Sequence, residues 1–381
     1  MLGGLFLKNR QLIFYSLMSA MVFATFISQA IIVPYHAREL QASKSLTGII
    51  LSVFGISSVI FAPLAALISD RIERKLPIVQ IGFIIGAVFS FAFYLNTEKF
   101  FLIPIRFAMG ASYALTAPLL QALASEALPE RRGRALGIYN ALSSLGWALG
   151  SLLSGWIAEI SLRHVFLFCA LLSLLGLSIS LFSKEKKVRL SFYLNLEHFK
   201  SLSPIYLTFF LRHTAAVSIW AFFPLFLEVF GATKAQVGFA FFLNMTVQTL
   251  FMSYAGEMAD RFGRGILVRV GILGSIGIFL GFAWSPSMFW IYLLQVILGI
   301  VWSLLYVGIS TMVADHSEWE VRSQAMAGLQ VTRDSAGILG PLIGGFLYQR
   351  MSFQEMIYTL LPLCFLSFLV SFRMREKSLK L

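Results

Sequence analysis

Charged side chains are scarce in this sequence. Only 13% of its 381 residues are Asp, Glu, Lys or Arg, whereas a soluble globular domain carries about 25%. Hydrophobic residues make up 58% of the chain. This composition excludes an ordinary soluble domain and predicts an all-α polytopic membrane protein, whose main partner is the lipid bilayer.

Cysteines and catalytic patterns are equally scarce. The two cysteines, Cys169 and Cys364, both lie in apolar runs, which argues against a disulfide framework and a cysteine-based metal site. We find no glycine-rich phosphate loop and no nucleophile–base pair. The sequence therefore predicts a protein that is not an enzyme, with no catalytic residue, no metal site and no bound cofactor.

Apolar runs long enough to cross a membrane recur along the chain. A spanning helix needs about 20 mainly apolar residues, and twelve such runs can be read. They cover residues 11–35, 45–68, 77–96, 100–124, 135–158, 164–183, 203–229, 236–256, 266–284, 287–313, 323–348 and 354–373. We therefore expect twelve transmembrane helices.

The most polar connection lies between the sixth and seventh runs. It begins at Lys184 and reaches Lys200, with three further basic residues between them. This segment predicts a division into an N-terminal six-helix bundle at 1–183, a cytoplasmic linker at 184–202 and a C-terminal six-helix bundle at 203–381.

Lysine and arginine gather on one side of the predicted spans. If both termini are cytoplasmic, the cytoplasmic segments carry 21 of these residues and the outer loops carry 6. Because short cytoplasmic loops are enriched in positive charge, we predict cytoplasmic N- and C-termini. The same distribution explains the net charge of +12 without a nucleic-acid partner.

The two halves of the chain repeat each other. Asp260 lies 190 residues after Asp70 in a similar charged stretch, and Gly340-Pro-Leu-Ile-Gly-Gly345 lies 190 residues after Gly150-Ser-Leu-Leu-Ser-Gly155. Each half has the same expected number of helices in the same orientation. We therefore expect parallel repeats related by an axis along the membrane normal.

One of these stretches resembles the signature loop of the major facilitator superfamily. It is Asp260-Arg261-Phe-Gly263-Arg264, with Gly256 four residues before the aspartate. The resemblance implies two pseudo-symmetric six-helix bundles that open a central site to each side in turn. Arg106 with Gly110 resembles a motif of proton-coupled members. The Gly340 segment resembles a motif that drug-efflux members carry in span five, here found in span eleven, and points to the drug-efflux branch of proton antiporters.

The resemblance also implies a cytoplasmic gate at the two charged stretches, which we expect to be bends between apolar runs. A carboxylate near a helix N-terminus gains about 0.3–1 kcal/mol from the helix dipole, and arginines can pair with it. The alternative is that these residues only set topology and form turns. The expected gate residues are Asp70, Arg71, Arg74, Gly256, Asp260, Arg261, Gly263 and Arg264.

Ionisable residues within spans are costly and are therefore candidates for function. Asp334 is the only acid deep within the expected spans, beside Arg333. It is a candidate for binding a proton or a cationic group, or alternatively for a static ion pair with Arg333 or Arg212. Arg106 and Arg212 are candidates for proton coupling, for attracting an anion, or for bonding helix carbonyls.

Uncharged polar and aromatic residues suggest a substrate cavity. Many such residues serve only to join helices, so we expect some of the set to touch substrate. Glu126 and Asp315, at comparable ends of spans four and ten, are predicted partners of the arginine-rich loops. The cavity candidates are Gln29, Tyr113, Asn140, Asn244, Gln248, Trp302 and Tyr306.

These patterns predict a monomeric, multi-pass secondary transporter of the cell membrane. Without an ATP-binding signature, its driving force is expected to be an ion gradient, with protons as the coupling partner. The favoured function is export of a small amphipathic, drug-like molecule. The alternatives are uptake or exchange of a polar metabolite such as a sugar or organic anion, and a membrane sensor or lipid-handling protein that does not transport.

Overall fold

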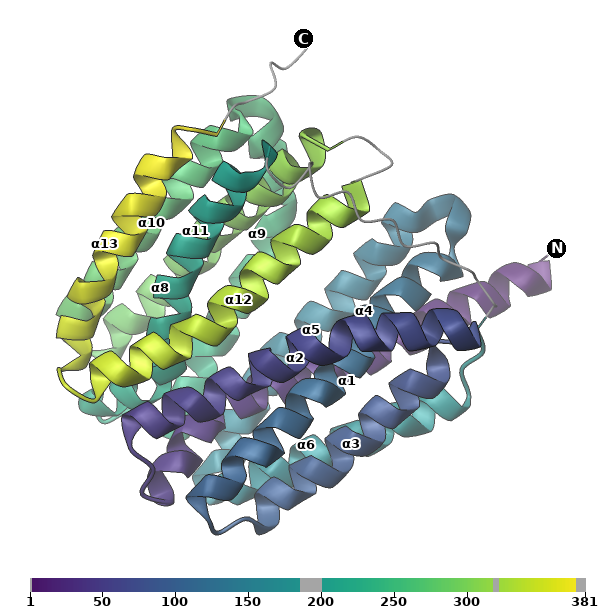
Figure 1. The fold of residues 1–381 in the computed structure, drawn as a ribbon, viewed down its shortest axis with the longest axis horizontal. Coiled ribbons are helices and arrows are strands. Elements are labelled where there is room, and N and C mark those ends of the chain that lie inside the picture. The colour runs from purple at the N-terminus through teal and green to yellow at the C-terminus, as the bar shows by residue number, and fades with distance from the viewer. Residues whose placement is uncertain (1, 186–200, 318–321, 375–381) are drawn as a thin grey trace. The chain divides into compact units, whose positions relative to one another are not determined.

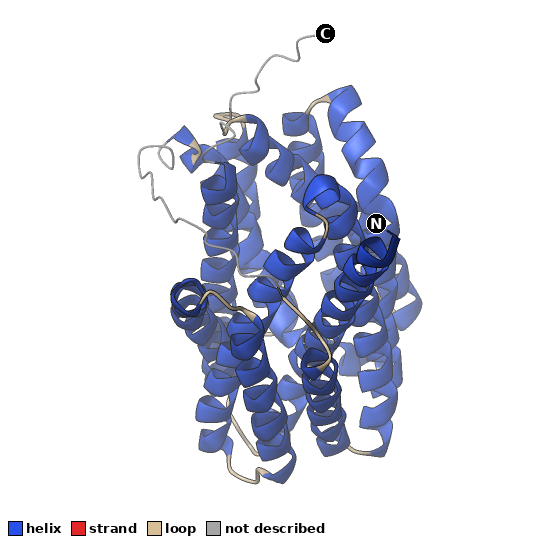
Figure 2. Cartoon of the chain, turned by 90° about the vertical axis from the view of Figure 1, so that its right-hand side faces the viewer, coloured by secondary structure: helices blue, strands red, loops and turns tan. Residues whose placement is uncertain are grey.

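The computed structural model describes residues 2–185, 201–317 and 322–374. These residues form twelve α-helices with three short 3₁₀ segments, and the described part of the chain contains no strand (Figures 1 and 2). The all-α prediction is therefore confirmed for this part. The predicted linker at 184–202 lies mostly outside the described residues.

Each predicted apolar run corresponds to one helix, with ends that differ by a few residues in most cases. The first half contains α1 (Leu2–Glu39), α2 (Lys44–Ile72), α3 (Leu76–Leu95), α4 (Leu102–Ala127), α5 (Arg132–Ile160) and α6 (Leu162–Leu181). The second half contains α8 (Ser203–Leu227), α9 (Lys234–Phe262), α10 (Arg264–Trp284), α11 (Met288–Asp315), α12 (Arg322–Tyr348) and α13 (Phe353–Ser371).

Eleven of the described helices are long and apolar enough to cross a membrane, and α12 is the exception. This helix has 27 residues, so it is long enough to span. Its composition is less apolar because Gln330, Thr332, Arg333, Asp334 and Ser335 follow one another closely. The count of twelve spans and the cytoplasmic position of both termini stay predictions.

The helices form two compact units. The first unit holds α1, α3 to α6 and most of α2, together with the start of α9 at Thr233–Phe242. The second unit holds α8, α10 to α13 and most of α9, together with the start of α2 at Lys44–Gly48. Cys169 and Cys364 are buried and free, one in each unit, as the sequence predicts.

The repeat is visible in individual contacts. In the first unit the Ser28 hydroxyl donates to the Gly150 carbonyl at 3.1 Å, which joins α1 to α5. In the second unit the Ser218 hydroxyl donates to the Gly340 carbonyl at 2.8 Å, which joins α8 to α12. Both partners are shifted by 190 residues, so the predicted duplication is confirmed at the level of hydrogen bonds.

Glycines permit these helices to approach closely. A Cβ atom on Gly150 would lie 2.6 Å from the Ala24 Cα, and one on Gly340 would lie 2.9 Å from the Val217 Cβ. Helix contacts in membranes depend on such packing because lipid supplies no hydrophobic drive for association. The expected role of both glycines in close helix approach is therefore confirmed.

The charged stretch around Asp260 is mostly helix, and the prediction of a bend throughout it is wrong. Helix α9 continues through Gly256 to Phe262 because nothing in this stretch breaks the backbone ladder before Gly263. Gly263 alone makes the turn, with φ of 92°. The equivalent residue of the first unit, Glu73, also has positive φ, at 54°.

Candidate functional site

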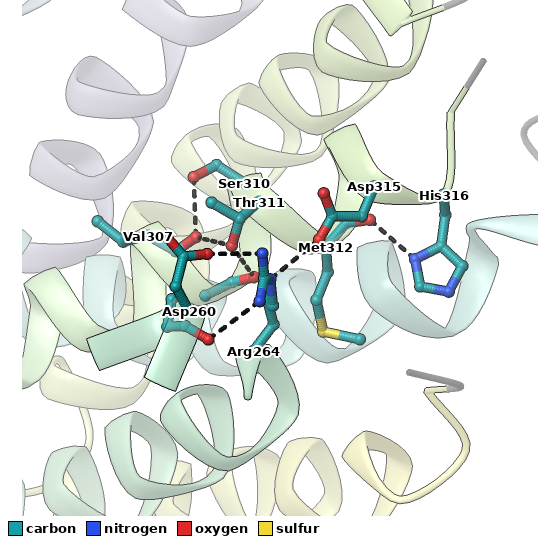
Figure 3. A network of polar contacts seen from close by, with 10 residues as sticks. Asp260, Arg264, Val307, Ser310, Thr311, Met312, Asp315 and His316 are labelled. Carbon is teal, nitrogen blue, oxygen red and sulfur yellow. Dashed lines mark hydrogen bonds and ion pairs between the residues drawn. The ribbon is translucent and has the colours of Figure 1, made fainter. Parts of the chain in front are cut away.

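An ion-pair network joins the end of α11 to the start of α10. Arg264 lies between two carboxylates: its Nε is 2.9 Å from Asp315 Oδ2, and its Nη2 is 2.7 Å from Asp260 Oδ1 (Figure 3). This geometry confirms that Asp315 is a partner of the arginine-rich loop.

The first unit makes the matching pair with different residues. Lys75 Nζ lies 3.0 Å from Glu126 Oε1, and both residues precede their counterparts Arg264 and Asp315 by 189 positions. The partner of Glu126 is therefore Lys75 at the start of α3, a residue that the sequence interpretation missed. The 189-residue offset would have found it.

The remaining gate candidates lie near the same helix ends. Arg71, Arg74 and Arg261 are exposed, and Asp70 is partly exposed. Gly256 lies within α9, and a Cβ added to it would meet no heavy atom within 4 Å. A gating role for these residues stays a prediction.

Arg106 on α4 is buried without a carboxylate partner. Its Nη1 donates to Gln29 Oε1 at 2.9 Å, and its Cζ lies 4.4 Å from the Phe54 ring centroid. Gln29 also donates from Nε2 to Ser90 Oγ at 3.3 Å. No acid in the described part of the chain lies within ion-pair distance of Arg106. Gln29, only 1% exposed, therefore holds the guanidinium instead of lining an open surface.

Arg212 on α8 is also buried and bonds to a neutral partner. Its Nε and Nη2 donate to the Ser275 hydroxyl at 3.0 and 2.7 Å. Its Cζ lies 5.1 Å from the Trp302 centroid. A charge held by one hydroxyl and an aromatic face is only weakly compensated, so Arg212 adds positive potential to the second unit.

Three aromatic side chains of the second unit form a ladder, defined here as His213, Trp302 and Tyr306. The His213 and Trp302 centroids lie 5.3 Å apart, and those of Trp302 and Tyr306 lie 5.6 Å apart with planes at 15°. Arg333 Cζ lies 6.0 Å from the Tyr306 centroid. Arg212 and His213, which were expected to face different directions, therefore both contact Trp302.

Asp334 is half-buried next to this ladder. One of its oxygens accepts from Gln330 Nε2 at 2.9 Å, which confirms that these two residues share a helix face. Asp334 forms no ion pair with a described residue: Arg212 bonds to Ser275, and Arg333 lies over Tyr306. The alternative of a static ion pair is therefore wrong for this structure.

The first unit has an aromatic cluster around Tyr113. Its ring centroid lies 5.9 Å from that of Phe23 and 5.4 Å from that of Phe26. Trp147 joins the cluster, stacked on Phe23 at 5.7 Å with planes at 26°. The sequence interpretation identified Tyr113 but missed Phe23 and Trp147, because isolated aromatic residues carry no signal in an apolar helix.

Three polar cavity candidates behave differently from one another. Asn244 is fully buried, and its Nδ2 donates to the Gln295 carbonyl at 3.0 Å. Gln248 in turn donates to the Asn244 side chain. This pair therefore connects α9 to α11, as polar groups between membrane helices commonly do. Asn140 on α5 is exposed.

Comparisons with known proteins agree with this architecture. The model of the Major Facilitator Superfamily matches residues 13–203 and 205–380. Multidrug resistance protein 2 of Bacillus subtilis is 24% identical over 364 residues, which cover 89% of this chain and 90% of that protein. Quinolone resistance protein NorA of Staphylococcus aureus is 28% identical over 169 residues, 44% of this chain and 43% of that protein.

Solved structures show the same fold at low identity. The nucleoside transporter NupG has a TM-score of 0.82 at 16% identity and covers 96% of this chain and 98% of its own. A bacterial homologue of the human lysosomal transporter Spinster has a TM-score of 0.85 at 14% identity, with 97% of both chains covered. With both halves matched by the family model, the chain belongs to the major facilitator superfamily, as a multi-pass membrane transporter that works by alternating access.

Proposed function

We propose that this protein exports small amphipathic, drug-like molecules in exchange for protons. The observation that carries the proposal is Asp334, a half-buried carboxylate that pairs with no cation in the described part of the chain. The names of two relatives, which refer to multidrug and quinolone resistance, favour export of such compounds.

Asp334 suits proton coupling because its charge is poorly compensated. In the charged form it accepts one hydrogen bond from Gln330, and a bound proton removes its negative charge beside the aromatic ladder. A cationic group and a proton then compete for the same carboxylate. Each pH unit of gradient supplies about 1.4 kcal/mol per proton, enough for roughly tenfold accumulation of a counter-transported substrate.

The test is the isosteric change Asp334→Asn in proteoliposomes. It removes the titrating group while keeping the shape and the Gln330 contact, so we expect loss of gradient-driven transport. Substrate exchange without a gradient should persist. Glu98→Gln, which removes an acid from the connection between α3 and α4, is the matched control and should behave like the wild type. Full gradient-driven transport by Asp334→Asn would refute the role of this carboxylate.

A second candidate is uptake or exchange of an organic anion. It is favoured by Arg106 and Arg212, two buried cations whose printed partners are a neutral amide, a hydroxyl and aromatic rings. Labelled anions should then enter liposomes loaded with unlabelled anion, and Arg212→Gln should reduce this counterflow. Absence of counterflow for a broad panel of anions would remove this candidate.

A further inference from the structure

The two units differ at one equivalent position next to the aromatic ladder. The contacts of Ser28 with Gly150 and of Ser218 with Gly340 fix the alignment of the paired helices at an offset of 190. With this offset Trp147 on α5 corresponds to Gly337 on α12. The bulkiest side chain in one unit is therefore replaced by none in the other.

The neighbours of this position also correspond. Phe23 on α1 aligns with His213 on α8 at the same offset. Tyr113 lies three residues after Gly110, and Trp302 lies three residues after Gly299. A Cβ on Gly110 would meet the Phe54 carbonyl at 2.3 Å, and one on Gly299 would meet the carbonyl of Asn244 at 2.9 Å, so these two glycines pack equivalently.

In the first unit an indole fills the position. Trp147 stacks on Phe23 with centroids 5.7 Å apart, and Phe23 also contacts Tyr113 at 5.9 Å. In the second unit the corresponding pair, His213 and Trp302, is in contact at 5.3 Å, but the third ring is missing. The repeat thus shows which shape completes the arrangement.

The corresponding place in the second unit is open. A Cβ added to Gly337 would meet no heavy atom within 4 Å, whereas one on Gly340, a turn later on the same face, would touch Val217 of α8 at 2.9 Å. Two contacts, Tyr206 with Ala325 and Ser218 with Gly340, show that α8 and α12 run in the same direction. Gly337 therefore lies on the face toward α8.

Two polar groups lie near this open place without full partners. Going back four residues from Val217 on α8 leads to His213, whose Nδ1 is buried and has no hydrogen-bond partner in the described part of the chain. Going back three residues from Gly337 leads to Asp334, on the same face of α12. Arg333 lies over Tyr306 and does not neutralise this carboxylate.

We propose that the second unit binds a fused, planar aromatic amine, with its ring beside Gly337 in the place that the Trp147 indole takes in the first unit. The ring stacks on His213, and the ammonium group reaches Asp334. This inference rests on the proposed proton-coupled export and adds the substrate class. It also explains coupling, because proton and ammonium compete for one carboxylate.

Radiolabelled tryptamine is the probe, because it joins an indole to an ammonium group. We expect it to bind purified wild-type protein more tightly than two competitors that each lack one feature. Cyclohexylethylamine lacks the aromatic ring and should compete about two- to tenfold more weakly, the range expected for an aromatic stacking pair. The neutral alcohol tryptophol lacks the charge and should also compete more weakly.

Filling the open place tests its position. Gly337→Trp restores the side chain of the first unit and should reduce tryptamine binding at least tenfold. Gly277→Trp is the control, because Gly277 on α10 is exposed and likewise has no heavy atom within 4 Å of an added Cβ. His213→Phe, which copies the first unit, should retain binding, whereas His213→Leu should weaken it.

The outcomes separate this inference from the proposed function. Unchanged tryptamine binding by Gly337→Trp, in protein that still moves protons with other amphipathic compounds, would overturn the ring site and leave the export function standing. Binding that is lost in Gly337→Trp alone, in protein that moves no protons with any compound, would support the ring site and refute the coupled export.

Discussion

At the scale of single residues, the turn between α9 and α10 depends on Gly263. Its φ of 92° and ψ of 147° lie in a region that is essentially restricted to glycine. Glu73 makes the corresponding turn with φ of 54°, in the left-handed region that other residues occupy at a cost. The better match of the second stretch to the family signature therefore has a backbone cause.

We predict that Gly263→Ala lowers the free energy of unfolding by about 1–3 kcal/mol, because alanine must adopt this strained conformation. Gly256→Ala is the matched control seven residues earlier. It lies within α9 with open space around it, so it should be neutral or stabilising by up to about 1 kcal/mol. Thermal unfolding in detergent measures both. Equal effects of the two changes would contradict the assignment of the turn to Gly263.

Buried arginines show how this protein accommodates charge at individual positions. Arg106 bonds to Gln29 and faces the Phe54 ring, and Arg212 bonds to Ser275. Neither contact could be predicted from the sequence, because helical periodicity gives the face of a residue and not the helix that covers it. The positions of both arginines within apolar runs were enough to mark them as unusual.

At the scale of helices, α1 pairs with α5 and α8 pairs with α12 through glycine contacts and one serine–carbonyl bond each. These close contacts need bare backbone on one side. In α5 the requirement applies to Gly150, whose added Cβ would lie 2.6 Å from the Ala24 Cα. It does not apply to Gly137 on the same helix, which has no heavy atom within 4 Å of an added Cβ.

We therefore predict that Gly150→Ala destabilises the protein by about 1–3 kcal/mol, the usual cost of overpacking a tight contact. Gly137→Ala should be neutral or slightly stabilising, because alanine is the better helix former. The unfolding temperature of the two variants in the same detergent checks this difference. Equal unfolding temperatures would show that the α1–α5 contact tolerates separation and that Gly150 is not required there.

The helices themselves follow from the sequence because a spanning segment must satisfy its backbone internally. Their ends were less predictable: α9 continues six residues beyond the predicted end at residue 256, since charged residues at the membrane surface remain good helix formers. The polar helix α12 was also identified by its length and glycine pattern, although its composition alone does not mark it as a span.

At the scale of the whole molecule, the duplication connects sequence to site. It predicted two similar halves, and the ion pairs of Lys75 with Glu126 and of Arg264 with Asp315 repeat at an offset of 189. The candidate site arises where the halves diverge. Trp302 and Tyr306 were identified as candidates from the sequence, whereas the role of Gly337 emerged only when contacts of both units were compared.

The most direct test of the account uses proteoliposomes that enclose a pH-sensitive dye under a proton gradient. Addition of an amphipathic aromatic amine should cause a proton flux in liposomes with wild-type protein that exceeds the flux in protein-free liposomes. Liposomes with Asp334→Asn should match the protein-free ones. The same dye response in all three preparations, across a broad panel of such compounds, would contradict proton-coupled export.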